Sequence, residues 1–95
     1  MQPAVYILAN RPNGTLYVGV TGDLIARAWL QRAGRSSHFC VRYKVRQLVY
    51  FELHDDMRAA IAREKRMKKR RRAWKIRRVE EANPGWKDLW PSLLG

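Results

Sequence analysis

The chain has 95 residues, with 20 lysines and arginines against 8 aspartates and glutamates, which gives a formal net charge of +12 at pH 7. A chain this short folds as one small domain, and its single cysteine, Cys40, excludes an intramolecular disulfide or a zinc site built from several thiolates. No apolar run approaches the ~20 residues of a membrane-spanning helix, and the basic excess indicates a polyanionic partner, most often nucleic acid.

An antiparallel hairpin is predicted over residues 5–20, where two apolar, β-rich runs flank Arg11-Pro12-Asn13-Gly14. Asn-Gly after proline is a strong short-range turn signal. If Asn10 faces Thr15 across a four-residue loop, the register of the whole hairpin is fixed.

In this register Leu8 faces Tyr17 and Tyr6 faces Gly19. Because side chains alternate along a strand, all four residues share one face of the hairpin. The two tyrosines become diagonal neighbours beside a glycine, which leaves room for a ligand to approach the backbone. The alternative is an ordinary half-buried aromatic pair.

A helix is predicted over residues 24–33. Four residues at helical spacing line one of its faces: Leu24, Arg27, Ala28 and Gln31. An arginine on this stripe requires an anionic partner, because a guanidinium cannot shed its charge. That partner is either a ligand or one of the few acidic side chains.

Residues 34–43 are rich in turn-forming residues, so a loop is predicted there. Basic side chains in and just after it can contact phosphate: Arg35, His38, Arg42 and Lys44. Exposed loops also carry such residues for solubility, so both interpretations stand. Residues 45–53 are β-branched and aromatic and form the predicted third strand.

A second helix follows residues 54–56, and its predicted inward stripe consists of Met57, Ala60, Ile61, Glu64 and either Met67 or Lys68. Glu64 is therefore a carboxylate on the apolar side of a basic helix. Burying a carboxylate is costly unless it is paired or binds a metal. A structural ion pair with Arg27 and a metal site are the two alternatives.

A basic helical region, about residues 63–82, is predicted as one bent helix or two consecutive ones. Its candidate nucleic-acid contacts are Lys68, Lys69, Arg70, Arg71, Arg72 and Lys75. Like charges this dense destabilise a free helix and are tolerated near a polyanion, although a merely solvated face is the alternative. Residues 83–95 are predicted to pack back onto the domain, with Trp86 and Trp90 covering the core.

These features fit phosphodiester hydrolysis, which requires an activated water and stabilisation of the developing negative charge. Glu64 is the candidate ligand for a single Mg²⁺, an ion that keeps most of its waters and takes one or two carboxylates. Arg27 would bind the non-bridging oxygens. A tyrosine acting as general base needs a pKa lowered from ~10 by nearby positive charge, which the basic surroundings favour.

Val5-Tyr6 followed by Leu16-Tyr17-Val18-Gly19 resembles the two motifs of the GIY-YIG nuclease family, with Ala4-Val5-Tyr6 in place of the first triplet. More closely, it resembles the small single-domain members related to the catalytic domain of the excision-repair incision nuclease. The similarity extends over TLYVGVTGDLIARAW, RQLVYFE, AIAREKRMKK and RRAWKIRRVEEANPGWKDL.

The resemblance implies one α+β domain over residues 1–95, with a three-stranded, largely antiparallel sheet flanked by helices in the order ββαβαα. It implies a DNA endonuclease that uses one Mg²⁺ or Mn²⁺ and leaves a 3′-hydroxyl and a 5′-phosphate. Tyr6 and Tyr17 match the tyrosines that align or deprotonate the attacking water, and Gly19 matches the motif glycine. Arg27 matches the helix arginine, and Glu64 the metal-binding glutamate.

Gln31 departs from this pattern, because close relatives usually have histidine at this position. Glutamine can orient a water but has no accessible pKa with which to take its proton. The chain then uses Tyr6 or Tyr17 as the base, recruits His38, or is slow or inactive. The alternative function is therefore a non-catalytic DNA- or RNA-binding module with a nuclease fold.

The remaining expectations concern partners and location. We expect DNA as the partner, with RNA as the alternative, and neither a membrane nor a small-molecule cofactor. No signal-peptide pattern opens the chain, which favours a cytoplasmic protein. A role in DNA repair is suggested by the relatives alone, and no motif for reading bases is visible, which predicts little sequence specificity.

Overall fold

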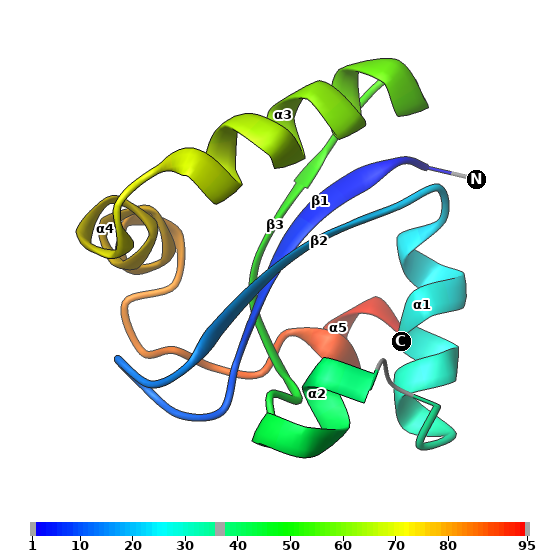
Figure 1. Ribbon diagram of the computed structural model, residues 1–95. Helices are drawn as coiled ribbons and strands as arrows, with labels where there is room; N and C mark the ends of the chain where they lie inside the picture. Colours follow the sequence, from blue (N-terminus) through cyan, green and yellow to red (C-terminus); the bar gives the residue numbers. More distant parts are fainter. Residues whose placement is uncertain (1, 36–37, 95) are drawn as a thin grey trace.

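The computed structural model describes residues 2–35 and 38–94. Its elements in chain order are β1 (Ala4–Ala9), β2 (Leu16–Thr21), α1 (Leu24–Arg32), α2 (His38–Tyr43), β3 (Gln47–Leu53), α3 (Met57–Lys69), α4 (Arg72–Ala82) and α5 (Trp90–Leu93). The strands form one antiparallel sheet in the order β2-β1-β3, which confirms the predicted α+β fold (Figure 1). None of the helices in the described ranges has the length and apolar character that crossing a membrane requires.

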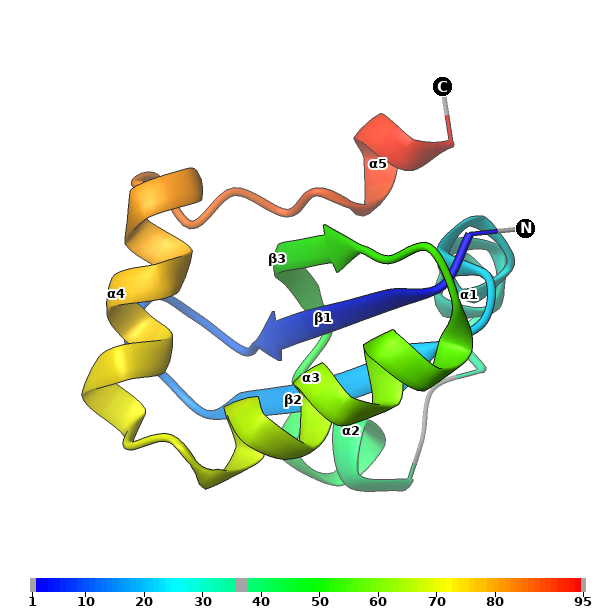
Figure 2. The same ribbon diagram turned by 90° about the horizontal axis from the view of Figure 1, so that it is seen from above.

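Helices cover both faces of the sheet (Figures 1 and 2). One buried cluster joins Tyr6 and Leu8 of β1 to α1, α2 and α5, and the other joins Val5 and Ile7 to α3 and α4. Every residue of β1 is buried, because this central strand has a helical layer on each side. The alternation along β1 thus decides which side chains reach which layer.

The hairpin has the predicted register, in which Leu8 pairs with Tyr17 and Tyr6 pairs with Gly19. The turn residue Asn13 has a φ of 57°, a left-handed conformation that asparagine tolerates and that a tight turn after proline uses. Turn chemistry and strand alternation together place both tyrosines on the face covered by α1, α2 and α5.

The loop predicted over residues 34–43 is corrected by the structure, because residues 38–43 form helix α2. A helix this short is not stable by itself. Its Cys40 is only 3% exposed and packs in the core cluster beneath α1, so tertiary packing rather than local propensity explains the helix. With α5 also present, the order is ββααβααα instead of ββαβαα.

The basic helical region forms two helices, which decides between the two alternatives. Helix α3 ends at Lys69, Arg70 has an extended backbone with ψ 151°, and α4 begins at Arg72. Like charges at four-residue spacing destabilise a continuous helix. The break at Arg70 and Arg71 interrupts this series of like charges.

The tail packs back onto the domain as predicted. Trp86 and Trp90 are each 5% exposed, and they enter the clusters on opposite faces of the sheet. The backbone N–H of Leu89 donates to the carbonyl of Leu48 at 2.8 Å, which ties the tail to β3. The tail therefore contributes to both cores as it passes the edge of the sheet.

Candidate active site

One cavity of about 130 Å³ brings together four of the five predicted catalytic residues, all except Glu64. The two strands of the hairpin contribute Tyr6 and Tyr17, and α1 contributes Arg27 and Gln31. Arg35, which follows α1, also lines it. The predicted helix stripe and the predicted strand register thus converge on a single site.

Tyr6 lies directly over Gly19, and its ring is 6.5 Å from that of Tyr17. A Cβ atom added at Gly19 would stand 2.6 Å from Cζ of Tyr6 and 2.7 Å from its hydroxyl oxygen. The space that we expected a ligand to use at this glycine is filled by the tyrosine, so that expectation is wrong. Glycine is needed here because only it allows the ring to approach the backbone this closely.

Arg27 is the arginine that the sequence places on the inward stripe of α1, where a guanidinium requires an anionic partner. Its Nε is buried and has no hydrogen-bond partner in the described part of the chain. The expected alternative, an ion pair with Glu64, does not form between these two described residues. Buried polar atoms are nearly always hydrogen-bonded, so the open Nε is unusual, and it belongs to a residue that lines the cavity.

Glu64 lies on α3 between the fully buried Ala60 and Met67, whereas Met57 and Ile61 of the predicted stripe are 37% and 38% exposed, so the buried stripe is narrower than predicted. Its side chain is 14% exposed, and its carboxylate pairs with Nζ of Lys68 at 3.3 Å. Its negative charge also acts on the phenol of Tyr6, whose pKa it raises. Glu64 is thus not among the described residues that line the cavity, whereas Arg27 lines it from α1.

The described residues near the site offer a divalent ion one carboxylate, that of Glu64. Among the described residues there is no cluster of three or more histidine, cysteine, aspartate or glutamate side chains. Glu64 is instead a single carboxylate near the phenol, with one lysine as its ion-pair partner. A hard ion that retains most of its waters needs no more than one or two carboxylates.

Burial raises the pKa of Tyr6 to about 12, although the positive charge of Arg27 lowers it in part. The expected lowering by basic surroundings is therefore wrong for this tyrosine, because desolvation of the phenolate outweighs the nearby guanidinium. At neutral pH Tyr6 keeps its proton and can donate a hydrogen bond to a phosphate oxygen or a water.

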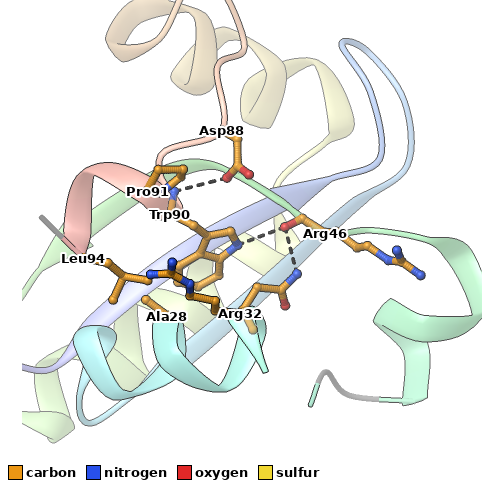
Figure 3. A pocket seen from close by; sticks show the side chains of 8 residues that line it. Ala28, Arg32, Arg46, Asp88, Trp90, Pro91 and Leu94 are labelled. Atoms are coloured by element: carbon orange, nitrogen blue, oxygen red, sulfur yellow. Dashed lines mark hydrogen bonds between the residues drawn. The ribbon is translucent and has the colours of Figure 1, made fainter. Parts of the chain in front are cut away.

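Gln31 is built into the wall of the site. Its Nε2 donates to the carbonyl of Arg46 at 3.1 Å, and the indole Nε1 of Trp90 donates to the same oxygen at 2.9 Å (Figure 3). Gln31 thus lies at the cavity together with Arg27 of the same helix. Its amide links α1 to the residues before β3.

The predicted nucleic-acid contacts fall into three groups. Those with exposed side chains are Arg35, Arg42, Lys44, Lys69, Arg70 and Arg71. Others have partners within the protein: Lys68 pairs with Glu64, and Nη2 of Arg72 donates to the carbonyl of Gly14 at 2.6 Å. Lys75 is half-buried, and desolvation followed by the charge of Arg72 lowers its pKa. The side chain of His38 lies outside the described residues.

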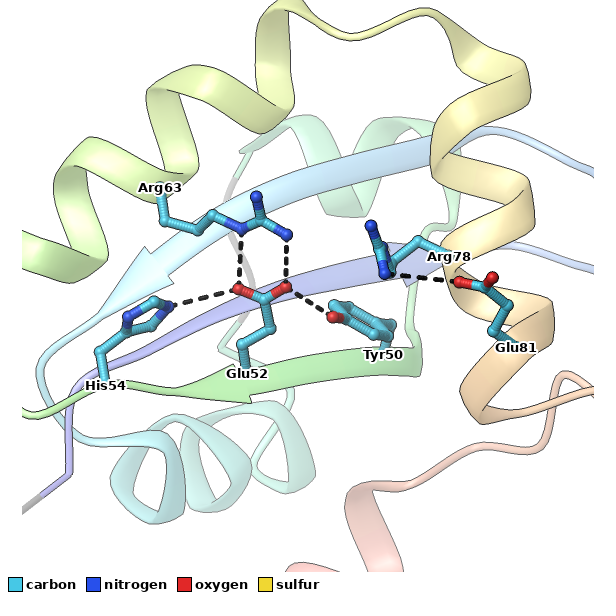
Figure 4. Close-up of polar contacts among 6 residues, drawn as sticks. All are labelled: Tyr50, Glu52, His54, Arg63, Arg78 and Glu81. Carbon is cyan, nitrogen blue, oxygen red and sulfur yellow. Dashed lines mark hydrogen bonds and ion pairs between the residues drawn. The ribbon is translucent and has the colours of Figure 1, made fainter.

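Sequence reasoning missed two features. Trp90 was interpreted as core cover, but it also lines the cavity, and its ring centroid is 6.3 Å from that of Tyr6. Glu52 was not singled out, although it accepts hydrogen bonds from Arg63 and Tyr50 on the other face of the sheet (Figure 4). An acid in an apolar strand, two residues after Tyr50, was the available signal.

A comparison of the sequence with known families finds a match. A family model described as the GIY-YIG catalytic domain matches residues 2–77. No curated protein and no solved structure matches the chain. Members of this family are generally endonucleases that depend on a divalent metal, and a nuclease domain implies a nucleic-acid substrate. Because the match covers most of the chain, from the hairpin through α3, the protein belongs to the GIY-YIG nuclease family.

Proposed function

We propose that this protein is a DNA endonuclease that requires one Mg²⁺ or Mn²⁺ and hydrolyses phosphodiester bonds. The observation that carries the proposal is the buried, unpartnered Nε of Arg27 in a cavity that Tyr6 and Tyr17 also line. A phosphate in this cavity would supply the acceptor that Arg27 lacks. Two tyrosines and a nearby carboxylate are then in place to act on it.

Each residue has a role that follows from its surroundings. Arg27 binds non-bridging oxygens of the scissile phosphate and stabilises the charge that develops there. Tyr6, protonated at neutral pH, donates to the phosphate or the attacking water, and Tyr17 lies beside it. Glu64 would hold the divalent ion, which when bound supplies Lewis-acid stabilisation of the leaving oxygen.

The exposed basic residues support a nucleic-acid substrate. Arg70 and Arg71 lie between α3 and α4, and Arg35 lines the cavity itself. If about six phosphates are neutralised, the logarithm of the binding constant should fall with the logarithm of salt concentration at a slope of roughly −5. DNA rather than RNA as the substrate, a cytoplasmic location and a role in DNA repair are parts of the same proposal.

A supercoiled-plasmid nicking assay with Mg²⁺ and with Mn²⁺ tests the proposal. We expect metal-dependent nicking by the wild type and none by Glu64→Ala, with DNA binding largely retained. Glu81→Ala is the matched control, because Glu81 is an exposed glutamate paired only with Arg78 on α4. Undiminished nicking by a rigorously purified Glu64→Ala protein would remove this site from consideration.

A non-catalytic binding module is the second candidate, and two observations favour it. The amide of Gln31 is bonded to the Arg46 carbonyl, and Tyr6 has a raised pKa, so neither is poised to take a proton at neutral pH. Nicking by Gln31→His but not by the wild type would show that only the base is missing. If neither protein nicks DNA but both bind it without metal, the protein is a non-catalytic binding module. A preference for RNA over DNA in a competition assay would then identify RNA as its partner.

A further inference from the structure

A second and larger hollow of about 650 Å³ lies between α1 and the tail (Figure 3). Helix α1 contributes Ala28 and Arg32 to it, and the tail contributes Asp88, Trp90 and Leu94. Its volume is in the range of sites that hold a small organic ligand. The tail lies beyond the region that the family model matches, so this groove is not a feature of the matched domain alone.

The walls of the groove combine apolar surface with charged side chains. Ala28, Trp90 and Leu94 provide apolar surface, and Arg32 provides positive charge, whereas the side chain of Arg46 points away from the groove and only its backbone carbonyl lies at the wall (Figure 3). Such an apolar slot with a few polar groups suits a flat ligand that carries a charged substituent. A nucleotide has this constitution, with a planar base and an anionic phosphate.

Asp88 adds an acceptor in a fixed orientation. Its Oδ1 accepts from the backbone N–H groups of Leu48 and Trp90, each at 3.1 Å. Within the described residues its Oδ2 has no hydrogen-bond partner. A carboxylate oxygen held in this way can accept from the exocyclic amino group of a base, as aspartate does from N4 of cytosine.

The groove is continuous in its lining with the cavity of the candidate active site. Gln31 and Trp90 line both hollows. The ring centroid of Trp90 lies 6.3 Å from that of Tyr6, and Trp90 also lines the groove. A strand whose phosphate reaches Arg27 therefore has its neighbouring nucleotide at the mouth of the groove.

We propose that the groove between α1 and the tail binds one unpaired nucleotide of the substrate strand, next to the scissile phosphate. This inference rests on the proposed function, since it places the nucleotide relative to Arg27. The base must be unpaired, because a base stacked within a duplex cannot enter a lateral pocket. Arg32 faces its phosphate, and Oδ2 of Asp88 accepts from its amino group.

Binding of short DNA strands to the Glu64→Ala protein tests this without cleavage. A single abasic residue is moved along the strand, and the dissociation constant is measured at each position. We expect one position at which removal of the base weakens binding about tenfold, the scale of losing one stacked base. Leu94→Trp, which fills the groove, should abolish this dependence. Leu53→Trp makes the same change at an exposed leucine at the end of β3 and should preserve it.

Asp88→Asn gives a second variant that keeps the fold. Its Oδ1 still accepts from Leu48 and Trp90, while Oδ2 is replaced by an amide nitrogen, which is a donor. At the sensitive position the parent protein should bind cytosine more tightly than thymine, and Asp88→Asn should narrow or reverse that preference.

The outcomes separate this inference from the proposed function. Equal binding at every abasic position, or a Leu94→Trp protein that discriminates like its parent, overturns the groove as a nucleotide site even if plasmid nicking is robust. A tighter affinity for fully paired duplex than for single strands also overturns it. Base-dependent binding by a protein that never nicks would sustain the groove and refute the endonuclease.

Discussion

The two faces of the sheet each carry a partly buried arginine, with opposite degrees of pairing. On the α3 and α4 side, Nε and Nη2 of Arg63 donate to the two oxygens of Glu52, each at 3.0 Å. Tyr50 donates to the same carboxylate at 2.5 Å, and His54 lies 3.3 Å from it (Figure 4). On the other side, Nε of Arg27 is buried without a partner among the described residues.

This difference separates a structural network from a binding site. A network in which every member is satisfied rigidifies the fold, and its removal leaves uncompensated charge. A buried donor left open costs stability, and in the proposed function it would be offered to an incoming phosphate. The two arginines should therefore respond to mutation in opposite ways.

The largest expected effect is the loss of nicking in Arg27→Ala. We expect the rate to fall by at least about 100-fold, the range found when one charge-stabilising donor is removed from an active site. Thermal unfolding should be unchanged or slightly later, because a buried unsatisfied group is removed. Arg58→Ala, an exposed arginine near the start of α3, controls for the lost charge. Normal nicking by Arg27→Ala would contradict the assignment.

Glu52→Ala should show the reverse behaviour. We expect the free energy of unfolding to fall by about 3 kcal/mol, because Arg63 loses both its charged acceptors. Nicking measured well below the melting temperature should stay near the wild-type rate. Urea unfolding provides the measurement, and Glu81→Ala, which breaks an exposed pair, should change stability by less than about 1 kcal/mol. A large loss of activity in the folded variant would give Glu52 a role in the site.

Sequence reasoning succeeded where local chemistry decides the structure. The Pro-Asn-Gly turn fixes the hairpin register, and the register with the helix stripe brings Tyr6, Tyr17 and Arg27 to one cavity. It failed where tertiary packing decides. Helix α2 depends on the burial of Cys40, which no local pattern shows.

The pKa of Tyr6 was misjudged for the same reason. The net charge of +12 favours a lowered pKa, whereas burial beneath α1 and against Trp90 raises it. Composition gives the average field of a chain, but desolvation depends on which neighbours enclose a group. Glu64 pairs with Lys68 and not with Arg27. Glu64 and Lys68 are four positions apart on α3, so this pairing is set within the helix itself.

Gly19→Ala should disturb the site face through packing alone. The new methyl group would stand 2.6 Å from the ring of Tyr6, so the ring or the strand must move. We expect a loss of about 2 kcal/mol, as for other overpacked sites, together with reduced nicking. The double variant Gly19→Ala with Tyr6→Phe is informative, because the hydroxyl accounts for one of the close contacts. Full stability of Gly19→Ala would mean that the ring has another place to lie.

The smallest expected effect is a difference in alkaline stability between the wild type and Tyr6→Phe. The pKa of Tyr6 is raised by burial to about 12 in the folded protein, against ~10 for an unperturbed tyrosine. Between these values the unfolded chain releases the proton and the folded protein keeps it, so stability is present below pH 10 and is lost as pH rises toward 12.

This loss should have a slope of up to ~1.4 kcal/mol per pH unit for one group, and it should be missing from Tyr6→Phe. Tyr50 supplies the comparison from the other face, because burial and then the hydrogen bond to Glu52 raise its pKa as well. Glu52→Ala should reduce the contribution of Tyr50 and leave that of Tyr6 intact. If Glu52→Ala removed both contributions, the two faces would not be independent, and the contrast between a closed network and an open site would fail.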